Sequence, residues 1–88
     1  MTNGFAALAE PMRQKIIERL AARPMSVGDL ANGLPVSRPA ISQHLKVLKE
    51  AGLVRGDVDG PRVCYCADPQ AVERLKSLLQ RLGHEGDS

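Results

Sequence analysis

The stretch that decides the fold is VSRPAISQHLKVLKEAG, residues 36–52. Signals typical of helix boundaries stand at both of its ends. Ser37 can cap the free N–H groups of a first turn in which Pro39 is tolerated, and Gly52 can end the helix in the left-handed conformation. The apolar residues between them follow i, i+4, i+7 spacing: Ile41, Leu45 and Leu48. The stretch therefore predicts an amphipathic helix with one buried face.

The opposite face of this predicted helix is polar and has a single acid. At about 100° per residue, that face holds Pro39, Ser42, Gln43, Lys46 and Glu50, with Arg38 and Lys49 at its edge. Arginine and glutamine can pair with base edges, and serine or lysine can hold a phosphate. A solvated face on a core helix would have a similar composition, so this helix alone leaves both interpretations open.

A second helix is predicted directly before this stretch. Ser26 and Asp29 have the spacing of a capping box, with aspartate in place of the usual glutamate. The segment Gly33-Leu34-Pro35 then forms a turn into the central helix. Two short helices joined by a glycine-containing turn are typical of a helix-turn-helix, which here spans residues 26–52.

The apolar period changes to two after the central helix, which indicates β-strands. Asp59-Gly60 is a hairpin turn signal, and the return strand is predicted over residues 62–67. A hairpin that follows a helix-turn-helix is a wing, here residues 53–67. An isolated two-stranded hairpin is only marginally stable, so we expect the wing to pack on the helices.

Helices are also predicted at both ends of the chain. Residues 1–23 contain a short first helix and a second one that begins at Pro11, with Arg13, Lys15, Glu18 and Arg19 towards water. Residues 68–82 predict a last helix that begins with Asp68-Pro69 and carries a leucine stripe. Gly83 is expected to end it, which leaves residues 83–88 as a polar tail.

The string from Val36 to Val54 resembles the recognition helix and wing entry of ArsR-type (ArsR/SmtB) winged-helix repressors. Glu10-Pro11-Met12-Arg13 also resembles the opening of that family, and the similarity covers roughly residues 5–82. The resemblance implies a mainly α fold with a small β-hairpin, a winged helix-turn-helix of about five helices and a two-stranded wing. Residues 1–88 would form a single DNA-binding domain.

The composition limits the classes of function. A chain of 88 residues with net charge +2 is one small domain, and such a chain buries only about 60–65% of its extended surface, so dimerisation is a common remedy. One Phe, one Tyr and no Trp argue against single-strand nucleic-acid binding by stacking. No apolar run approaches the roughly 20 residues that span a bilayer. Two cysteines without a signal peptide fit a reducing cytoplasm, so we expect a cytoplasmic protein without membrane contact.

The resemblance implies a homodimeric transcriptional repressor that binds double-stranded DNA at an inverted repeat, with no cofactor and no enzymatic activity. Arg38 and Gln43 are expected at base edges, and the serines and Lys46 at phosphate or sugar. Arg62 on the wing is placed to meet a phosphate or the minor groove. The predicted DNA-binding residues are Ser37, Arg38, Pro39, Ser42, Gln43, Lys46 and Arg62.

The two ends of the chain form the predicted pairing surface of the dimer. The helix-turn-helix and wing can cover only part of the apolar stripe on the last helix, and relatives pair through these helices. The predicted dimerisation residues are Phe5, Leu8, Val72, Leu75, Leu78, Leu79 and Leu82.

Metal and catalytic sites are weakly indicated. Metal-sensing relatives have a Cys-x-Cys pair where this chain has Ser26 and Gly28, or ligands on the last helix at spacings that Glu73, His84 and Glu85 do not match. The chain therefore resembles the branch without a recognisable metal site.

The sequence has no glycine-rich phosphate loop and no nucleophile elbow, which disfavours an enzyme.

Cys64 and Cys66 and the single histidine of the central helix need separate interpretations. The two thiols are about 6.6 Å apart by strand rise, a poor geometry for a disulfide, and two ligands alone do not complete a metal site. We expect them to fill the wing, and His44 to be a partly buried, hydrogen-bonded structural residue. Two alternatives remain: a thiol- or metal-responsive repressor that senses through Cys64 and Cys66, and a winged-helix protein-interaction module without DNA binding.

Overall fold

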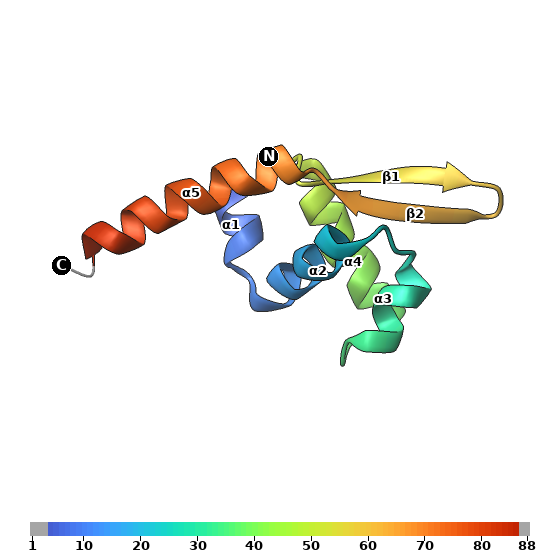
Figure 1. The fold of residues 1–88 in the computed structure, drawn as a ribbon. Coiled ribbons are helices and arrows are strands. Elements are labelled where there is room, and N and C mark those ends of the chain that lie inside the picture. The colour runs from blue at the N-terminus through green and yellow to red at the C-terminus, as the bar shows by residue number, and fades with distance from the viewer. Residues whose placement is uncertain (1–3, 87–88) are drawn as a thin grey trace.

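In the computed structural model, residues 4–86 are described, apart from the side chains of residues 59, 79 and 82–86. The elements follow in the order α1 (Gly4–Ala9), α2 (Pro11–Ala22), α3 (Val27–Gly33), α4 (Arg38–Glu50), β1 (Val54–Asp59), β2 (Arg62–Ala67) and α5 (Pro69–Gly86). Helices α1 to α4 gather at the centre, while α5 and the β1–β2 hairpin extend in opposite directions (Figure 1). Five helices and a two-stranded hairpin confirm the predicted winged helix-turn-helix.

Helix α4 forms as its sequence predicts. The Ser37 hydroxyl accepts a hydrogen bond from Ala40 N at 3.3 Å, which caps the first turn. At the other end, Gly52 has a φ of +78° and Leu53 N donates to Leu48 O at 2.9 Å. This is the Schellman arrangement, and it turns the chain directly into β1.

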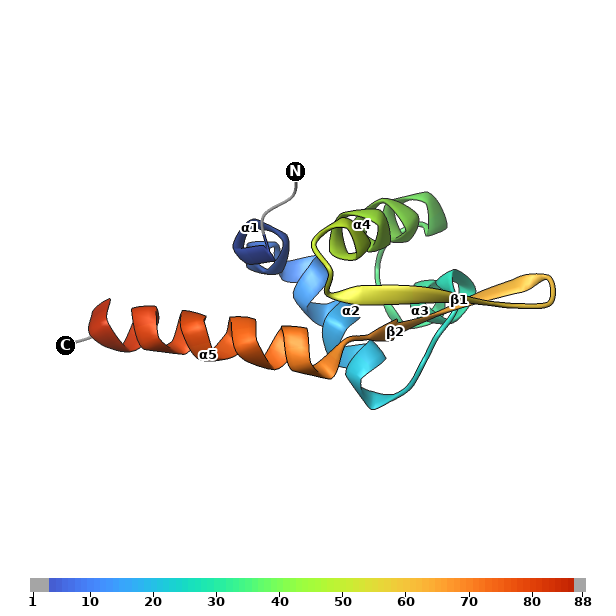
Figure 2. The ribbon, with the colours of Figure 1, turned by 90° about the horizontal axis from the view of Figure 1, so that it is seen from above.

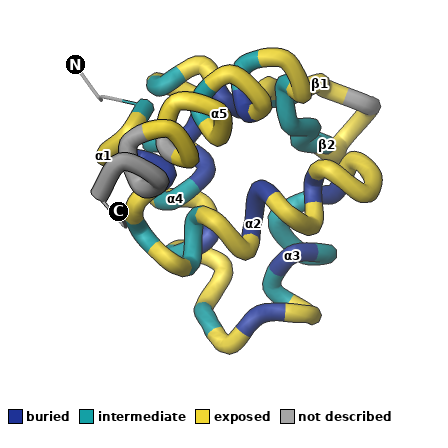
Figure 3. Tube along the Cα trace, turned by 60° about the vertical axis from the view of Figure 1, so that its left-hand side comes forward, coloured by how far each residue is buried: buried dark blue, intermediate teal, exposed yellow. Residues whose placement is uncertain are grey.

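The core is built around the buried face of α4. Ile41, Leu45 and Leu48 are almost fully buried. They belong to one cluster to which all five helices and β1 contribute (Figure 3). Its other members are Ala7, Leu8, Ile16, Ile17, Leu20, Met25, Leu30, Leu34, Leu53, Val54 and Val72. Burying each large aliphatic side chain contributes about 1.5–3 kcal/mol, so this cluster fixes how α4 lies on the other helices.

Helix α3 begins with the predicted capping box. Ser26 Oγ accepts from Asp29 N at 3.2 Å, and Asp29 Oδ2 accepts from Ser26 N at 3.2 Å. At the other end of α3, Arg19 Nη2 donates to Gly33 O at 2.9 Å, which satisfies a carbonyl of the last turn. These contacts fix both ends of a helix of only seven residues.

The wing, defined here as β1 and β2 with their turn, is an antiparallel hairpin in which Asp59 pairs with Arg62. Gly60 and Pro61 are therefore the two turn residues, and Gly60 has a φ of +61°. Tyr65 also exchanges two backbone hydrogen bonds with Met25, of 3.0 and 2.8 Å. This bridge from the α2–α3 connection was not predicted, and it ties the base of the wing to the helices.

Helix α5 begins as predicted but ends later. The Asp68 carboxylate accepts hydrogen bonds from Gln70 N and Ala71 N, which caps the first turn. The helix then continues through Gly83 to Gly86, so the prediction that it ends at residue 82 is wrong. Glycine weakens a helix interior by about 1 kcal/mol relative to alanine but does not prevent the helical conformation. Seen from above, α5 extends well beyond the other helices (Figure 2).

Candidate nucleic-acid interface

The predicted DNA-binding side chains of α4 lie together on its exposed face. Ser37, Arg38, Pro39, Ser42, Gln43 and Lys46 are all exposed. The opposite face carries the buried side chains of the core cluster, so packing determines which way this surface points. Glu50 is the one acidic residue of α4 and lies at its C-terminal end. The first three turns therefore present hydrogen-bonding and basic groups without a carboxylate of their own.

Arg38 lies across the junction between α3 and α4. A Cβ atom built on Gly28 would be 3.5 Å from Arg38 Nη2, so the guanidinium packs over the backbone of α3. Arg38 is exposed and occupies the first position of α4, where its side chain can turn outward. The structure places this predicted base-contacting residue at the surface, at the edge of the α4 face.

Arg62 lies at the start of β2 and contacts α3. Its Nη2 donates to Asp29 Oδ2 at 3.1 Å and to Ser26 Oγ at 3.2 Å. The prediction from sequence placed Arg62 on the wing but could not supply these partners, which are more than thirty residues away. The wing arginine and the first turn of α3 are thus one connected group.

Asp29 is the acidic member of that group. The backbone N–H and the side chain of Ser26 hold the pKa of the Asp29 carboxyl below its usual value, and the positive charges of Arg62 and Arg23 add to the effect. The carboxylate is therefore ionised at neutral pH. Its charged neighbours are Arg62 and Arg23.

His44 faces the interior of the helical domain. Its side chain is 22% exposed, and its Nδ1 lies 3.8 Å from Glu10 Oε2 and 3.5 Å from Arg13 Nη1. Both partners come from the start of α2. His44 is thus partly buried and within hydrogen-bonding distance of Arg13, as expected, and its structural role stays a prediction.

Arg13 corrects the sequence interpretation of α2, which placed it towards water. It is partly buried, and its Nε donates to Ala7 O at 2.6 Å while Nη2 donates to Ala6 O at 3.3 Å. Arg13 thereby binds the last turn of α1 and approaches His44 of α4. The Pro-x-Arg segment was a signal for this role, because it places Arg13 in the first turn of α2 beside the end of α1.

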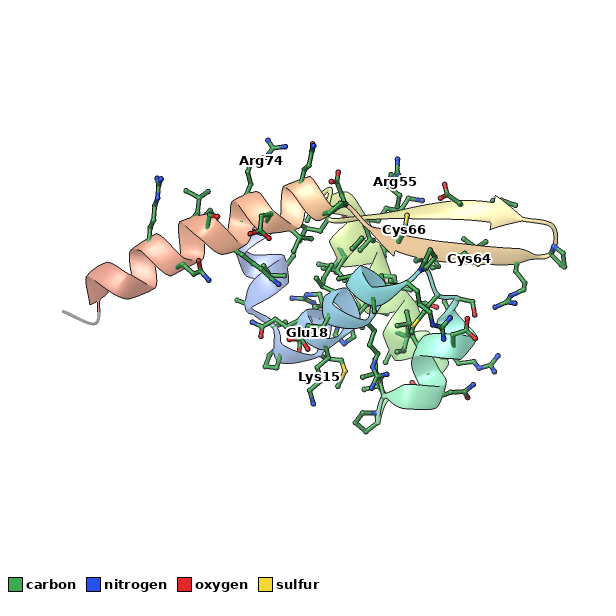
Figure 4. All side chains as sticks on the ribbon, viewed as in Figure 1. Lys15, Glu18, Arg55, Cys64, Cys66 and Arg74 are labelled. Atoms are coloured by element: carbon green, nitrogen blue, oxygen red, sulfur yellow. The ribbon has the colours of Figure 1, made fainter. Side chains whose placement is uncertain are left out.

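Both thiols lie on β2 of the wing, Cys66 opposite Arg55 and Cys64 opposite Asp57 (Figure 4). Cys64 and Cys66 are free and partly buried, and Cys66 Sγ lies 3.9 Å from Asp57 Oδ2. Among the residues that the structure describes, no three His, Cys, Asp or Glu side chains are grouped to hold a metal ion.

The predicted pairing surface divides into two sets. Leu8 and Val72 are 4% and 6% exposed, so their side chains pack in the core of the protomer rather than on its surface. Phe5 and Leu78 are 37% and 44% exposed, and Leu75 is half-buried. Leu75 and Leu78 line a groove between the start of α1, the end of α4 and α5. The side chains of Leu79 and Leu82 lie outside the described part of the chain.

A helix-turn-helix followed directly by a hairpin defines the winged helix-turn-helix class. A family profile described as a helix-turn-helix domain matches residues 8–57. The HTH-type transcriptional regulator Rv2034 of Mycobacterium tuberculosis is 53% identical over 77 residues, which are 88% of this chain and 72% of that protein. The transcriptional repressor SdpR of Bacillus subtilis is 30% identical over 88 residues, which are 100% of this chain and 98% of SdpR.

A solved structure gives the same result. The homodimeric winged helix-turn-helix DNA-binding domain of Mb0332 from Mycobacterium bovis, described as a possible ArsR-family transcriptional regulator, superposes with a TM-score of 0.75 and 31% identity. The match covers 92% of this chain and 75% of that one. The protein therefore belongs to the ArsR-type winged helix-turn-helix transcriptional regulators, as the sequence resemblance implied. In the described part of the chain, no helix combines the length and apolar character that crossing a membrane requires.

Proposed function

We propose that this protein is a homodimeric, sequence-specific DNA-binding transcriptional repressor. The observation that carries this function is the exposed face of α4, where Arg38, Ser42, Gln43 and Lys46 project from a helix anchored by its buried face. Arginine and glutamine suit base edges in the major groove, and lysine suits phosphate. The names of SdpR and of the Mb0332 domain support repression and homodimeric DNA binding.

Pairing is supported by the apolar groove beside α1 and α5. Leu78 is exposed there although it is a large aliphatic residue. A twofold dimer would present two α4 helices about one turn of DNA apart, roughly 34 Å. The operator is then an imperfect inverted repeat.

The rival from another class is a winged-helix protein-interaction module. An apolar or acidic α4 surface would favour such a module, whereas this one is polar and basic. The chemistry of the surface therefore favours nucleic acid.

Selection of bound duplexes from a random pool tests the proposal. Enrichment of an inverted repeat with half-sites about 10 base pairs apart is the expected result. Enrichment of no sequence would contradict the DNA-binding function, and enrichment of a single unpaired half-site would contradict the dimer. The variant Arg38→Ala with Gln43→Ala is the matched control, since it keeps the core and should not enrich the same repeat.

A further inference from the structure

One carboxylate lies among arginine side chains at the junction of α3, α4 and the wing. Asp29 Oδ2 is 3.1 Å from Arg62 Nη2, and Arg23 adds its positive field. The Arg38 guanidinium packs over Gly28, the neighbour of Asp29 in the chain. The acid therefore lies beside Arg62 of the proposed DNA surface and is the chain neighbour of the glycine that Arg38 covers.

The contact between Asp29 and Arg62 is exposed and can open. The Arg62 side chain is 59% exposed and that of Asp29 is 36% exposed. Exposed ion pairs are screened by water and salt and contribute little to stability. A DNA phosphate can therefore compete with the Asp29 carboxylate for the guanidinium.

We infer that Asp29 is an internal counter-ion that neutralises Arg62 in the DNA-free protein and so lowers affinity for DNA of any sequence. This inference rests on the proposed function. DNA affinity depends on the phosphates that basic groups neutralise, each of which steepens the dependence of log K on log salt by about 0.9. An arginine already paired with a carboxylate contributes less to that term than a free arginine does.

Asp29→Asn removes the charge and keeps the cap of α3. The hydrogen bond from Asp29 N to Ser26 Oγ involves the backbone of residue 29 and is unaffected. The carbonyl oxygen of an asparagine can accept from Ser26 N as the carboxylate oxygen does now. The substitution therefore separates the counter-ion role of Asp29 from its role in folding.

A double-mutant cycle measures the effect. Wild type, Asp29→Asn, Arg62→Gln and the double variant are titrated on a random-sequence duplex by fluorescence anisotropy over a series of salt concentrations. Asp29→Asn should tighten binding about three- to tenfold near 0.1 M salt and steepen the salt slope by about one. Arg62→Gln alone should change wild-type affinity less than about threefold, and the double variant should match Arg62→Gln.

Asp57→Asn is the matched control, because it removes the same charge from the wing while its carboxylate contacts Cys66 instead of Arg62. Asp57→Asn should change DNA affinity less than Asp29→Asn does. Its effect should be the same in wild type and in the Arg62→Gln background. The inference would be overturned if Asp29→Asn tightened DNA binding as much in the Arg62→Gln background as in wild type. It would also be overturned if Arg62→Gln alone reduced the salt slope by a full unit. Wild type that binds no DNA at all would overturn the proposed function as well, so the two failures are distinguishable.

Discussion

Arg38 and Lys46 lie on the same helix but offer different chemistry to DNA. The arginine guanidinium presents a fixed fork of donors that matches a guanine edge. The lysine ammonium is a compact charge that suits a phosphate, which is the same at every base pair. Both side chains are exposed, and Lys46 lies two turns further along α4 than Arg38. The two residues should therefore contribute differently to affinity and to specificity.

We predict that Lys46→Ala weakens binding to every sequence alike. Loss of one phosphate contact should reduce the salt slope by roughly one unit, measured by anisotropy on operator and random duplexes. Lys15→Ala removes the same charge from α2, on which Lys15 lies exposed outside the α4 face (Figure 4). It should leave the slope nearly unchanged. A loss confined to the operator would contradict the phosphate assignment of Lys46.

Glu10 is the residue at which α1, α2 and α4 meet. Its Oε2 accepts from Arg13 N at 2.9 Å and lies near His44. Partial burial raises the pKa of Glu10, but hydrogen bonds from the backbone N–H groups of Arg13 and Met12, with the charges of His44 and Arg13, outweigh it and hold the pKa below its ordinary value of 4.5. The folded state therefore takes up this proton at lower pH than the unfolded state.

Because folding lowers the pKa of Glu10, the stability of the protein depends on pH. The contribution of Glu10 to the free energy of unfolding should be complete above about pH 4.5, the ordinary pKa of the group. It should be lost as the pH falls through the lower pKa that Glu10 has in the folded state, because the unfolded chain binds the proton first. Denaturant unfolding between pH 3 and 7 should show a shallower acid loss for Glu10→Gln than for wild type. Equal pH dependence of the two proteins would contradict this role of Glu10.

At the scale of elements, the wing is held at two places. Its base is bridged to Met25 through Tyr65, and its outer end contacts α3 through Arg62. Gly56 makes room for the Tyr65 ring, since a Cβ there would lie 3.1 Å from Tyr65 Cε1. The cysteines take no part in either attachment, and their register partners on β1 are Arg55 for Cys66 and Asp57 for Cys64.

We therefore predict that Cys64→Ser combined with Cys66→Ser changes operator affinity less than about threefold, equivalent to under about 0.7 kcal/mol. Zinc, arsenite or mild peroxide should not release the wild-type protein from its operator. The measurement is anisotropy of a labelled operator with and without each agent. Release of wild type, together with resistance of the double variant, would instead support the thiol- or metal-responsive repressor.

Local signals predicted the elements, whereas contacts between distant residues could not be predicted. Ser37 and Gly52 mark the two ends of α4, because the residues that cap a helix are within a few positions of its ends. The Met25–Tyr65 bridge joins residues forty positions apart, and no local pattern in the sequence marks it. The same applies to the Asp29–Arg62 pair. The candidate surface on α4 could be predicted, but not the attachment of the wing beside it.

At the scale of the whole molecule, the domain is elongated, with extents of 49 × 26 × 25 Å. Helix α5 extends away from the core on one side and the wing on the other (Figures 1 and 2). A helix that extends in this way has few contacts within its own protomer to cover its apolar side chains. Pairing through α5 would cover them and would set the distance between the two α4 helices.

We predict that Leu78→Asp produces a monomer with little operator affinity. A charge placed at the pairing surface must be desolvated without a partner, which opposes association. Sedimentation velocity at micromolar concentration should show a dimer for wild type and a monomer for this variant. Gln80→Asp introduces the same charge on the side of α5 that faces α2, so it should remain dimeric. A folded wild-type monomer at that concentration would contradict the dimer.

In the proposed function, the exposed face of α4 reads DNA sequence. The most direct test of this readout is the affinity of wild type and Arg38→Ala for the selected operator and for random duplexes, at one salt concentration. The substitution should cost about 1–3 kcal/mol on the operator, relax the preference at one base position, and cost much less on random DNA. Equal losses on operator and random DNA would contradict base readout by this helix.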